Sequence, residues 1–109
     1  MKYRVVFHEQ ARHEAIDAAT YIARQGNPEA AQRWFAGLQR VVQSLSDWPR
    51  RCPHAREHGI LEHMELRQIL HHSHRVIFTV VDDVVHVLHI RHAAREGLCD
   101  PDAPPGERL

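Results

Sequence analysis

Residues 66–95 read LRQILHHSHRVIFTVVDDVVHVLHIRHAAR, and the expected fold follows from them. Two runs rich in β-branched and aromatic residues flank the pair Asp82-Asp83. The runs are too short for ordinary amphipathic helices and lack a helical period, so they indicate the two strands of a β-hairpin. Asp tolerates the left-handed conformation of a tight turn, and we therefore expect a two-residue loop at Asp82-Asp83.

A two-residue loop also sets the pairing of the two strands. It places Val81 opposite Val84, Thr79 opposite His86, Ile77 opposite Leu88, and Arg75 opposite Ile90. Because side chains alternate between the faces of a sheet, one face is expected to carry His74, Val76, Phe78, Val80, Val85, Val87, His89 and Arg91. Both faces are apolar near the turn. Such a sheet needs two covers, one from the rest of the chain and a second from a partner.

The preceding residues predict the first cover. Residues 3–7 alternate as a short strand, and residues 9–24 carry apolar side chains, mostly alanine, at helical spacing. Gly26 ends that helix and Asn27-Pro28 begins a second one, which runs to about Ser46. Gly37 inside it indicates either a close approach between the helices or a tolerated defect. Residues 66–70 predict a third strand, joined to the hairpin by a turn at residues 72–73.

The order β-α-α-β-β-β predicts an α+β domain, an antiparallel sheet with an N-terminal strand and a two-helix hairpin packed on one face. A chain of 109 residues suits one domain. Residues 1–95 carry 13 Lys and Arg against 10 Asp and Glu, whereas residues 96–109 carry 1 against 4. We therefore expect a folded domain over residues 1–96 and an acidic, proline-rich, disordered tail over residues 97–109.

Cellular location follows from what the sequence lacks. No apolar run approaches the length that spans a bilayer, and the first residues show no signal-peptide core. Cys52 and Cys99 lie in loop-like stretches and suggest free thiols in a reducing compartment. We expect a cytoplasmic protein that does not contact a membrane.

Residues 74–95 and the helical part together resemble the RelE/ParE superfamily of bacterial toxin–antitoxin toxins. Members have a Tyr-Arg-Val-Ile-Tyr-like strand, an acidic turn, and a valine-rich strand ending in His-Gly-x-Arg or a relative. The matching residues here are His74-Arg75-Val76-Ile77-Phe78, Asp82-Asp83 and His92-Ala93-Ala94-Arg95, with Asn27-Pro28-Glu29-Ala30-Ala31 and Asp47-Trp48-Pro49-Arg50 in the helical part. The resemblance covers residues 3–95 and implies the toxin of a type II toxin–antitoxin pair.

Two branches of the superfamily imply different mechanisms. The ParE-like branch, which the two-helix hairpin and residues 92–95 match better, implies growth inhibition and plasmid stabilisation. Its members bind DNA gyrase or another replication target and are neutralised by a cognate antitoxin in a hetero-oligomer. The residues expected to bind target or antitoxin are Arg67, Arg75, Arg91, His92 and Arg95.

The RelE-like branch implies an endoribonuclease that cleaves mRNA on the ribosome. That reaction needs proton-transfer groups and cations for the phosphorane, and Arg75, His92 and Arg95 are the candidates here. The lysines of that branch are replaced by the Leu66-Arg67-Gln68 stretch, and no tyrosine follows Tyr21. A third alternative is an inactive domain that binds only its antitoxin.

Plainer interpretations apply to several of these residues. Arg75 and Arg91 suit equally a functional surface or pairing with Asp and Glu on the sheet. Adjacent histidines such as His71 and His72 point to opposite faces of a strand, and no His-Glu-x-x-His or Cys-x-x-Cys spacing occurs. We therefore expect neither a metal site nor a cofactor.

Overall fold

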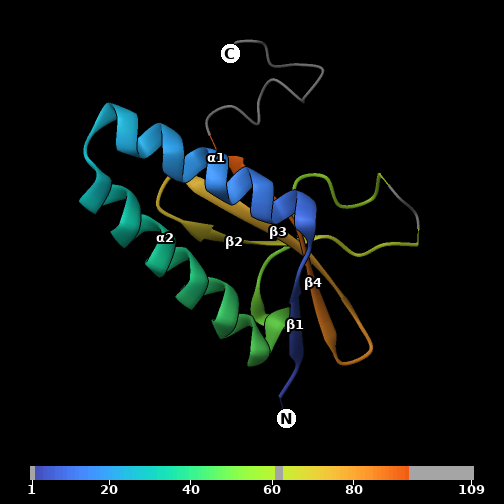
Figure 1. Ribbon diagram of the computed structural model, residues 1–109. Coiled ribbons are helices and arrows are strands. Elements are labelled where there is room, and N and C mark those ends of the chain that lie inside the picture. Colours follow the sequence, from blue (N-terminus) through green and yellow to red (C-terminus); the bar gives the residue numbers. More distant parts are fainter. Residues whose placement is uncertain (1, 61–62, 94–109) are drawn as a thin grey trace.

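The computed structural model describes residues 2–60 and 63–93 and has the expected order of elements (Figure 1). Strand β1 (Arg4–Phe7) leads into the helices α1 (Glu9–Gln25) and α2 (Pro28–Gln43). Two short 3-10 helices, Ser44–Ser46 and Pro49–Arg51, follow, and then the strands β2 (Arg67–His71), β3 (His74–Val81) and β4 (Val84–His92). The α+β class and the β-α-α-β-β-β order are confirmed.

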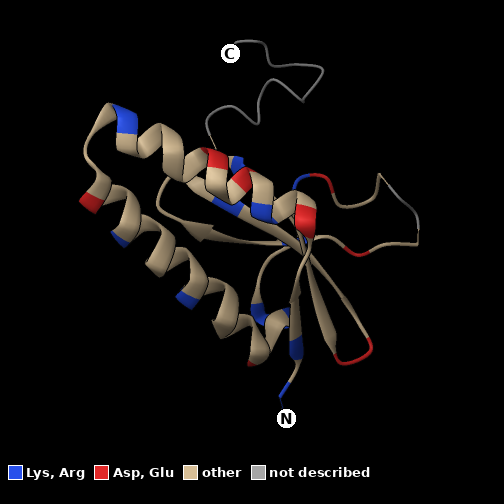
Figure 2. Ribbon diagram, viewed as in Figure 1, with Lys and Arg blue, Asp and Glu red and all other residues tan. Residues whose placement is uncertain are grey.

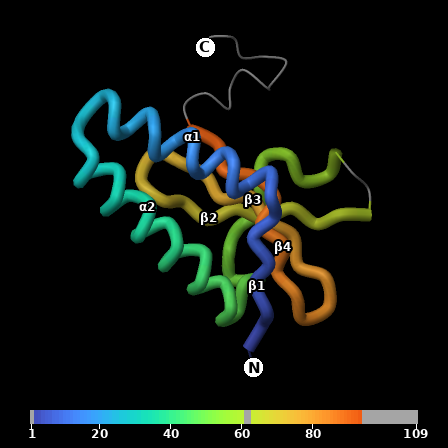
Figure 3. Tube along the Cα trace, in the orientation of Figure 1, coloured from blue at the N-terminus to red at the C-terminus, as the bar shows by residue number. Residues whose placement is uncertain are grey.

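The described strands form one mixed sheet in the order β1-β4-β3-β2. Strands β2, β3 and β4 are antiparallel neighbours as expected, whereas β1 pairs with β4 in parallel, Phe7 beside Val87. The expectation of an antiparallel sheet is therefore corrected at this one pairing. Helix α1 packs over the C-terminal half of β4, and β1, which leads directly into α1, has to run toward that end (Figure 3).

The helical hairpin forms where local sequence signals place it. The Oδ1 atom of Asn27 accepts a hydrogen bond from the backbone N–H of Ala30 at 2.7 Å, which satisfies an N–H that has no partner in the first turn of α2. Pro28 occupies the first helical position of α2. Helix α1 buries Ala11 and Ala15 completely, so its backbone lies close to the sheet. Both helices cover the same face of the sheet (Figure 1).

The β3–β4 hairpin has the predicted two-residue turn, with Asp82 in the left-handed conformation at φ 55°. The predicted pairs Val81–Val84 and Thr79–His86 are confirmed. Beyond Phe78 the register shifts by one residue because Leu88 is an extra residue in β4, a β-bulge.

The bulge corrects the remaining pairs. Ile77 lies opposite His89 rather than Leu88, and Arg75 lies opposite Arg91 rather than Ile90. His89 and Arg91 therefore leave the face on which they were expected. Ile90 takes a place on the helix-covered face beside Val76 and is 4% exposed.

The main core lies between the helices and the sheet. It contains the buried side chains of Ala11, Ala15, Trp34, Leu38, Val42, Leu45, Cys52, Val76, Phe78, Val80, Val85, Val87 and Ile90. Cys52 is a free thiol, as expected, and burial raises its pKa. Cys99 and the tail over residues 97–109 lie outside the described residues.

The opposite face of the sheet is partly covered by the chain itself. Ala55, Met64 and Leu66, from the segment between α2 and β2, pack against Ile77 and Leu88. The expectation that a partner must supply the second cover is therefore wrong for this part of the sheet. In the described residues, no helix is both long enough and apolar enough to cross a bilayer.

Candidate functional site

Arg75 is a buried half of an ion pair. Its side chain is 1% exposed, and its two terminal nitrogens bind the two carboxylate oxygens of Glu57 at 2.6 and 3.2 Å. The Nη1 atom also donates to the side-chain oxygen of Gln68 at 2.5 Å. A buried guanidinium is tolerated when a carboxylate compensates its charge in this bidentate arrangement. Arg75 therefore ties the covering segment to the sheet.

Arg67 is also paired with a glutamate. Its Nη2 lies 2.7 Å from the Glu65 carboxylate, and its Nη1 donates to the backbone carbonyl of Cys52. His54 approaches the same carboxylate at 3.2 Å, and Arg50 at 3.8 Å. Hydrogen bonding from His54, and then from Arg67, holds the pKa of the Glu65 carboxyl below its usual value.

Arg91 is also paired with a glutamate, Glu14 of α1. The Nε atom of Arg91 lies 3.5 Å from the Glu14 carboxylate, which also contacts Nδ1 of His89 at 3.3 Å. The same carboxylate accepts the backbone N–H of Ile90 at 2.8 Å, at the edge of β4 beyond the end of β1. Glu14 thus binds the part of the β4 edge that β1 leaves unpaired, and it also binds Arg91.

The structure brings together only some of the predicted site residues. Arg75 faces Arg91 across β3 and β4, and His74 faces His92, whose ring lies 5.0 Å from it. Arg67 pairs with Phe78, in the interior of β3, so it lies apart from this group. Arg95 lies outside the described residues. In each described case the arginine has a glutamate partner.

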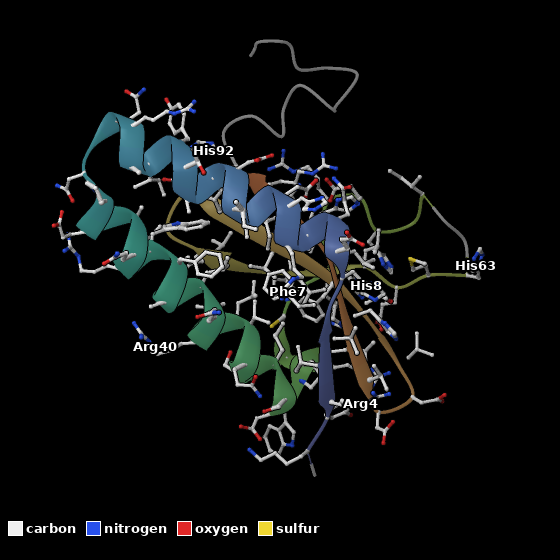
Figure 4. The ribbon with its side chains drawn as sticks, in the orientation of Figure 1. Arg4, Phe7, His8, Arg40, His63 and His92 are labelled. Carbon is white, nitrogen blue, oxygen red and sulfur yellow. The ribbon has the colours of Figure 1, made fainter. Side chains whose placement is uncertain are left out.

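A groove between α2 and β2 was not anticipated from the sequence. Its volume is about 750 Å³, and its walls include Arg33, Trp34, Gly37 and Arg40 of α2 with His71 and His72. Arg33, Gly37 and Arg40 recur at helical spacing, which was the available signal. Figure 2 shows these basic positions along α2, and Figure 4 shows Arg40 projecting from it on the side away from α1.

The floor of the groove depends on Gly37. A Cβ atom there would lie 2.8 Å from Cε1 of His71, so glycine permits α2 to approach β2. The close approach therefore joins a helix to a strand, not the two helices. His71 donates from Nε2 to the carbonyl of Trp34 at 2.9 Å, and burial lowers the pKa of its imidazole.

The groove is cationic and borders an open strand edge. Within residues 2–60 and 63–93, Arg33 and Arg40 form no ion pair, and no acidic side chain lines the groove. β2 is the last strand of the sheet, and among the described residues only 53 and 54 bridge its outer edge, at Gln68 and Arg67. An acidic segment can add a strand to such an edge and place its carboxylates on the arginines.

In the described part of the chain, no cluster of three or more His, Cys, Asp or Glu side chains is placed to hold a metal ion. His54 and His58 stack face to face at 3.8 Å, but the Nδ1 atom of His58 accepts the backbone N–H of Leu66. The site therefore consists of paired arginines on the sheet and a groove with unpaired arginines on α2.

Comparison with known proteins gives a consistent result. A family model described as "ParE toxin of type II toxin-antitoxin system, parDE" matches residues 5–97. A curated relative from Caulobacter vibrioides, "Toxin RelE2", is 38% identical over 72 residues, which are 65% of this chain and 74% of the relative.

Solved structures are similar in fold. The chromosomal ParDE system of P. aeruginosa has a chain with a TM-score of 0.68 at 12% identity, covering 84% of this chain and 96% of that one. The archaeal RelE-RelB complex of Pyrococcus horikoshii OT3 gives a TM-score of 0.51 at 24% identity, covering 87% and 99%.

Proposed function

The chain belongs to the ParE toxin family of type II toxin–antitoxin systems, and from this premise we propose that it inhibits growth by binding a replication target such as DNA gyrase. A cognate antitoxin neutralises it in a cytoplasmic hetero-oligomer. The toxin acts by occupying its target rather than by chemistry of its own.

One observation carries the proposal, namely that Arg67, Arg75 and Arg91, the predicted site arginines that the structure describes, are already paired. Phosphoryl-transfer chemistry on RNA needs cations directed at the phosphate. Arg75 directs its guanidinium into Glu57, Arg67 binds Glu65, and Arg91 binds Glu14. Arg75 is also buried, which leaves it no access to a substrate.

The groove between α2 and β2 supports the proposal that an antitoxin binds the chain. We propose that an acidic antitoxin segment lies along α2, with carboxylates on Arg33 and Arg40, and adds a strand to the outer edge of β2. Backbone hydrogen bonds to the edge supply affinity, and the two arginines select an acidic segment.

The test combines two assays on cells and purified protein. The chain is expressed without an antitoxin, cellular mRNA is mapped by primer extension, and gyrase supercoiling is measured with the purified chain. We expect growth to stop, supercoiling to be inhibited and mRNA to stay intact. Where the neighbouring reading frame encodes a small acidic protein, its co-expression should restore growth. Charge reversal of Arg33 and Arg40 to Glu should weaken that rescue, and reversal of exposed Arg24 on α1 should not.

The second candidate is a RelE-like endoribonuclease, favoured by the 38% identity to a curated RelE toxin. In it Arg75, His92 and Arg95 would act on the scissile phosphate, and single replacements would slow cleavage on the order of 10²–10⁴-fold. Codon-positioned mRNA cuts that disappear in His92→Ala, with supercoiling unaffected, would establish the ribonuclease and overturn the gyrase mechanism.

A further inference from the structure

Trp48, between the two 3-10 helices, is an exposed side chain on a strained backbone. It is 74% exposed, more than the other exposed large hydrophobic side chains of the described residues. Its φ and ψ are 46° and 62°, the left-handed region, and a proline follows it. A bulky residue is rare in that region, and a residue before proline normally adopts an extended conformation.

Neighbouring groups hold this strained turn in place. The Arg51 guanidinium donates to the carbonyls of Asp47 and Trp48. Lys2 binds the Asp47 carboxylate at 2.9 Å, and the N–H of Tyr3 donates to the carbonyl of Ser46 at 2.8 Å. Pro49, in contrast to Trp48, is fully buried. Several interactions therefore hold the backbone in a strained conformation that exposes the indole to solvent. Packing of the core does not require this conformation.

The surroundings of the indole are mainly basic. Lys2, Arg50 and Arg51 lie on this turn or are bridged to it, and two carboxylates face them: Asp47 in the turn and Glu65, which lies 3.8 Å from Arg50. Exposed Trp beside Arg is the composition of protein-binding hot spots, and a turn that is already ordered lowers the entropy lost on binding.

We propose that Trp48 anchors the surface by which the toxin binds its cellular target, an acidic protein surface with a pocket that admits the indole. The inference rests on the proposed function. It assigns the target to the Trp48 turn and leaves the groove between α2 and β2 to the antitoxin. Trp48 is not among the groove's lining residues.

A protein fits this surface better than a nucleic acid strand. Single-stranded nucleic acid binds along a basic groove with several aromatic rings in series. Here one indole projects from a turn, and it does not line the groove. The positive charge around the turn attracts an acidic partner, but it does not form a continuous basic groove for a phosphate backbone.

The experiment compares Trp48→Ala and Trp48→Gly with Ile60→Ala, which removes another side chain that is 72% exposed. Growth inhibition is measured at equal protein levels without antitoxin, and the midpoint of gyrase supercoiling inhibition is measured with purified chains. We expect both Trp48 variants to lose at least about 30-fold in potency, the size of a hot-spot loss. Ile60→Ala and binding of the antitoxin should be unchanged.

Trp48→Gly separates recognition from folding. Glycine adopts a positive φ without strain, so this variant should melt at or above the temperature of Trp48→Ala while remaining equally inactive. Equal potency of Trp48→Ala and the unsubstituted chain would overturn the inference alone. Loss of antitoxin binding instead of potency would also overturn it, because the groove partner would then occupy the turn.

Two further outcomes are decisive. A single-stranded oligonucleotide that quenches the emission of the chain, but not of Trp48→Phe, would replace the protein partner by nucleic acid. If the unsubstituted chain fails to inhibit growth, the proposed function fails, and the assignment of Trp48 to a target falls with it.

Discussion

Arg75 shows what a single residue's identity does and does not reveal. The sequence places it within a family motif on β3, so it was a candidate for a functional cation. Its partner Glu57 lies 18 residues earlier, in a segment without a periodic pattern. Nothing local predicts that this segment folds over the sheet, and the burial of Arg75 was therefore invisible in the sequence.

Removing that partner should destabilise the fold. Glu57→Ala leaves a buried guanidinium without its carboxylate, and we expect a loss of about 3 kcal/mol in the free energy of unfolding, measured in urea. Glu57→Gln should lose less because it retains an acceptor. Glu9→Ala, which removes an exposed carboxylate 3.8 Å from His13, is the control and should change stability by less than about 1 kcal/mol. A loss that small for Glu57→Ala would show that the pair is dispensable.

At the scale of elements, those with local signals were predicted and those set by long-range contacts were not. The Asn27-Pro28 cap, the Asp82-Asp83 turn and the turn at residues 72–73 all depend on residues adjacent in sequence. The bulge at Leu88 interrupts a run of apolar and histidine residues that looks continuous. The parallel pairing of β1 and the groove between α2 and β2 join residues far apart in the chain, and no local pattern encodes either.

The contact between α2 and β2 should make stability depend on pH. Burial, and secondarily the charges of His72 and Arg40, lower the pKa of His71, whereas its bond to Trp34 raises it. The unfolded chain, with the usual value of 6.5, therefore takes up a proton that the folded chain resists. The contribution of the buried, neutral His71 to the free energy of unfolding is therefore complete above pH 6.5. It is lost progressively as the pH falls below that value.

His71→Gln retains a donor for the Trp34 carbonyl and cannot titrate. We expect the free energy of unfolding of this variant to fall less steeply between pH 7 and pH 5 than that of the unsubstituted chain. His13→Gln, on the exposed surface of α1, should keep the original slope. Identical slopes for all three proteins would refute the assignment.

At the scale of the whole molecule, the domain boundary remains a prediction. Residues 97–109 are rich in proline and acidic residues, a composition that offers little apolar area for burial. Truncation after Glu96 should shift the melting temperature by no more than about 2 °C, less than a loss of 1 kcal/mol would cause. Calorimetry of the full-length and shortened chains measures this, and a larger drop would place the tail within the folded domain.

The segment that packs Ala55, Met64 and Leu66 on the second sheet face bears on the timing of toxicity. A toxin whose own chain covers part of the second face depends less on a partner to reach its folded state. Under the proposed function, a chain released from its antitoxin would already be folded and able to bind its target. We then expect the delay before growth stops to be set by how fast the antitoxin dissociates, with no folding step in between.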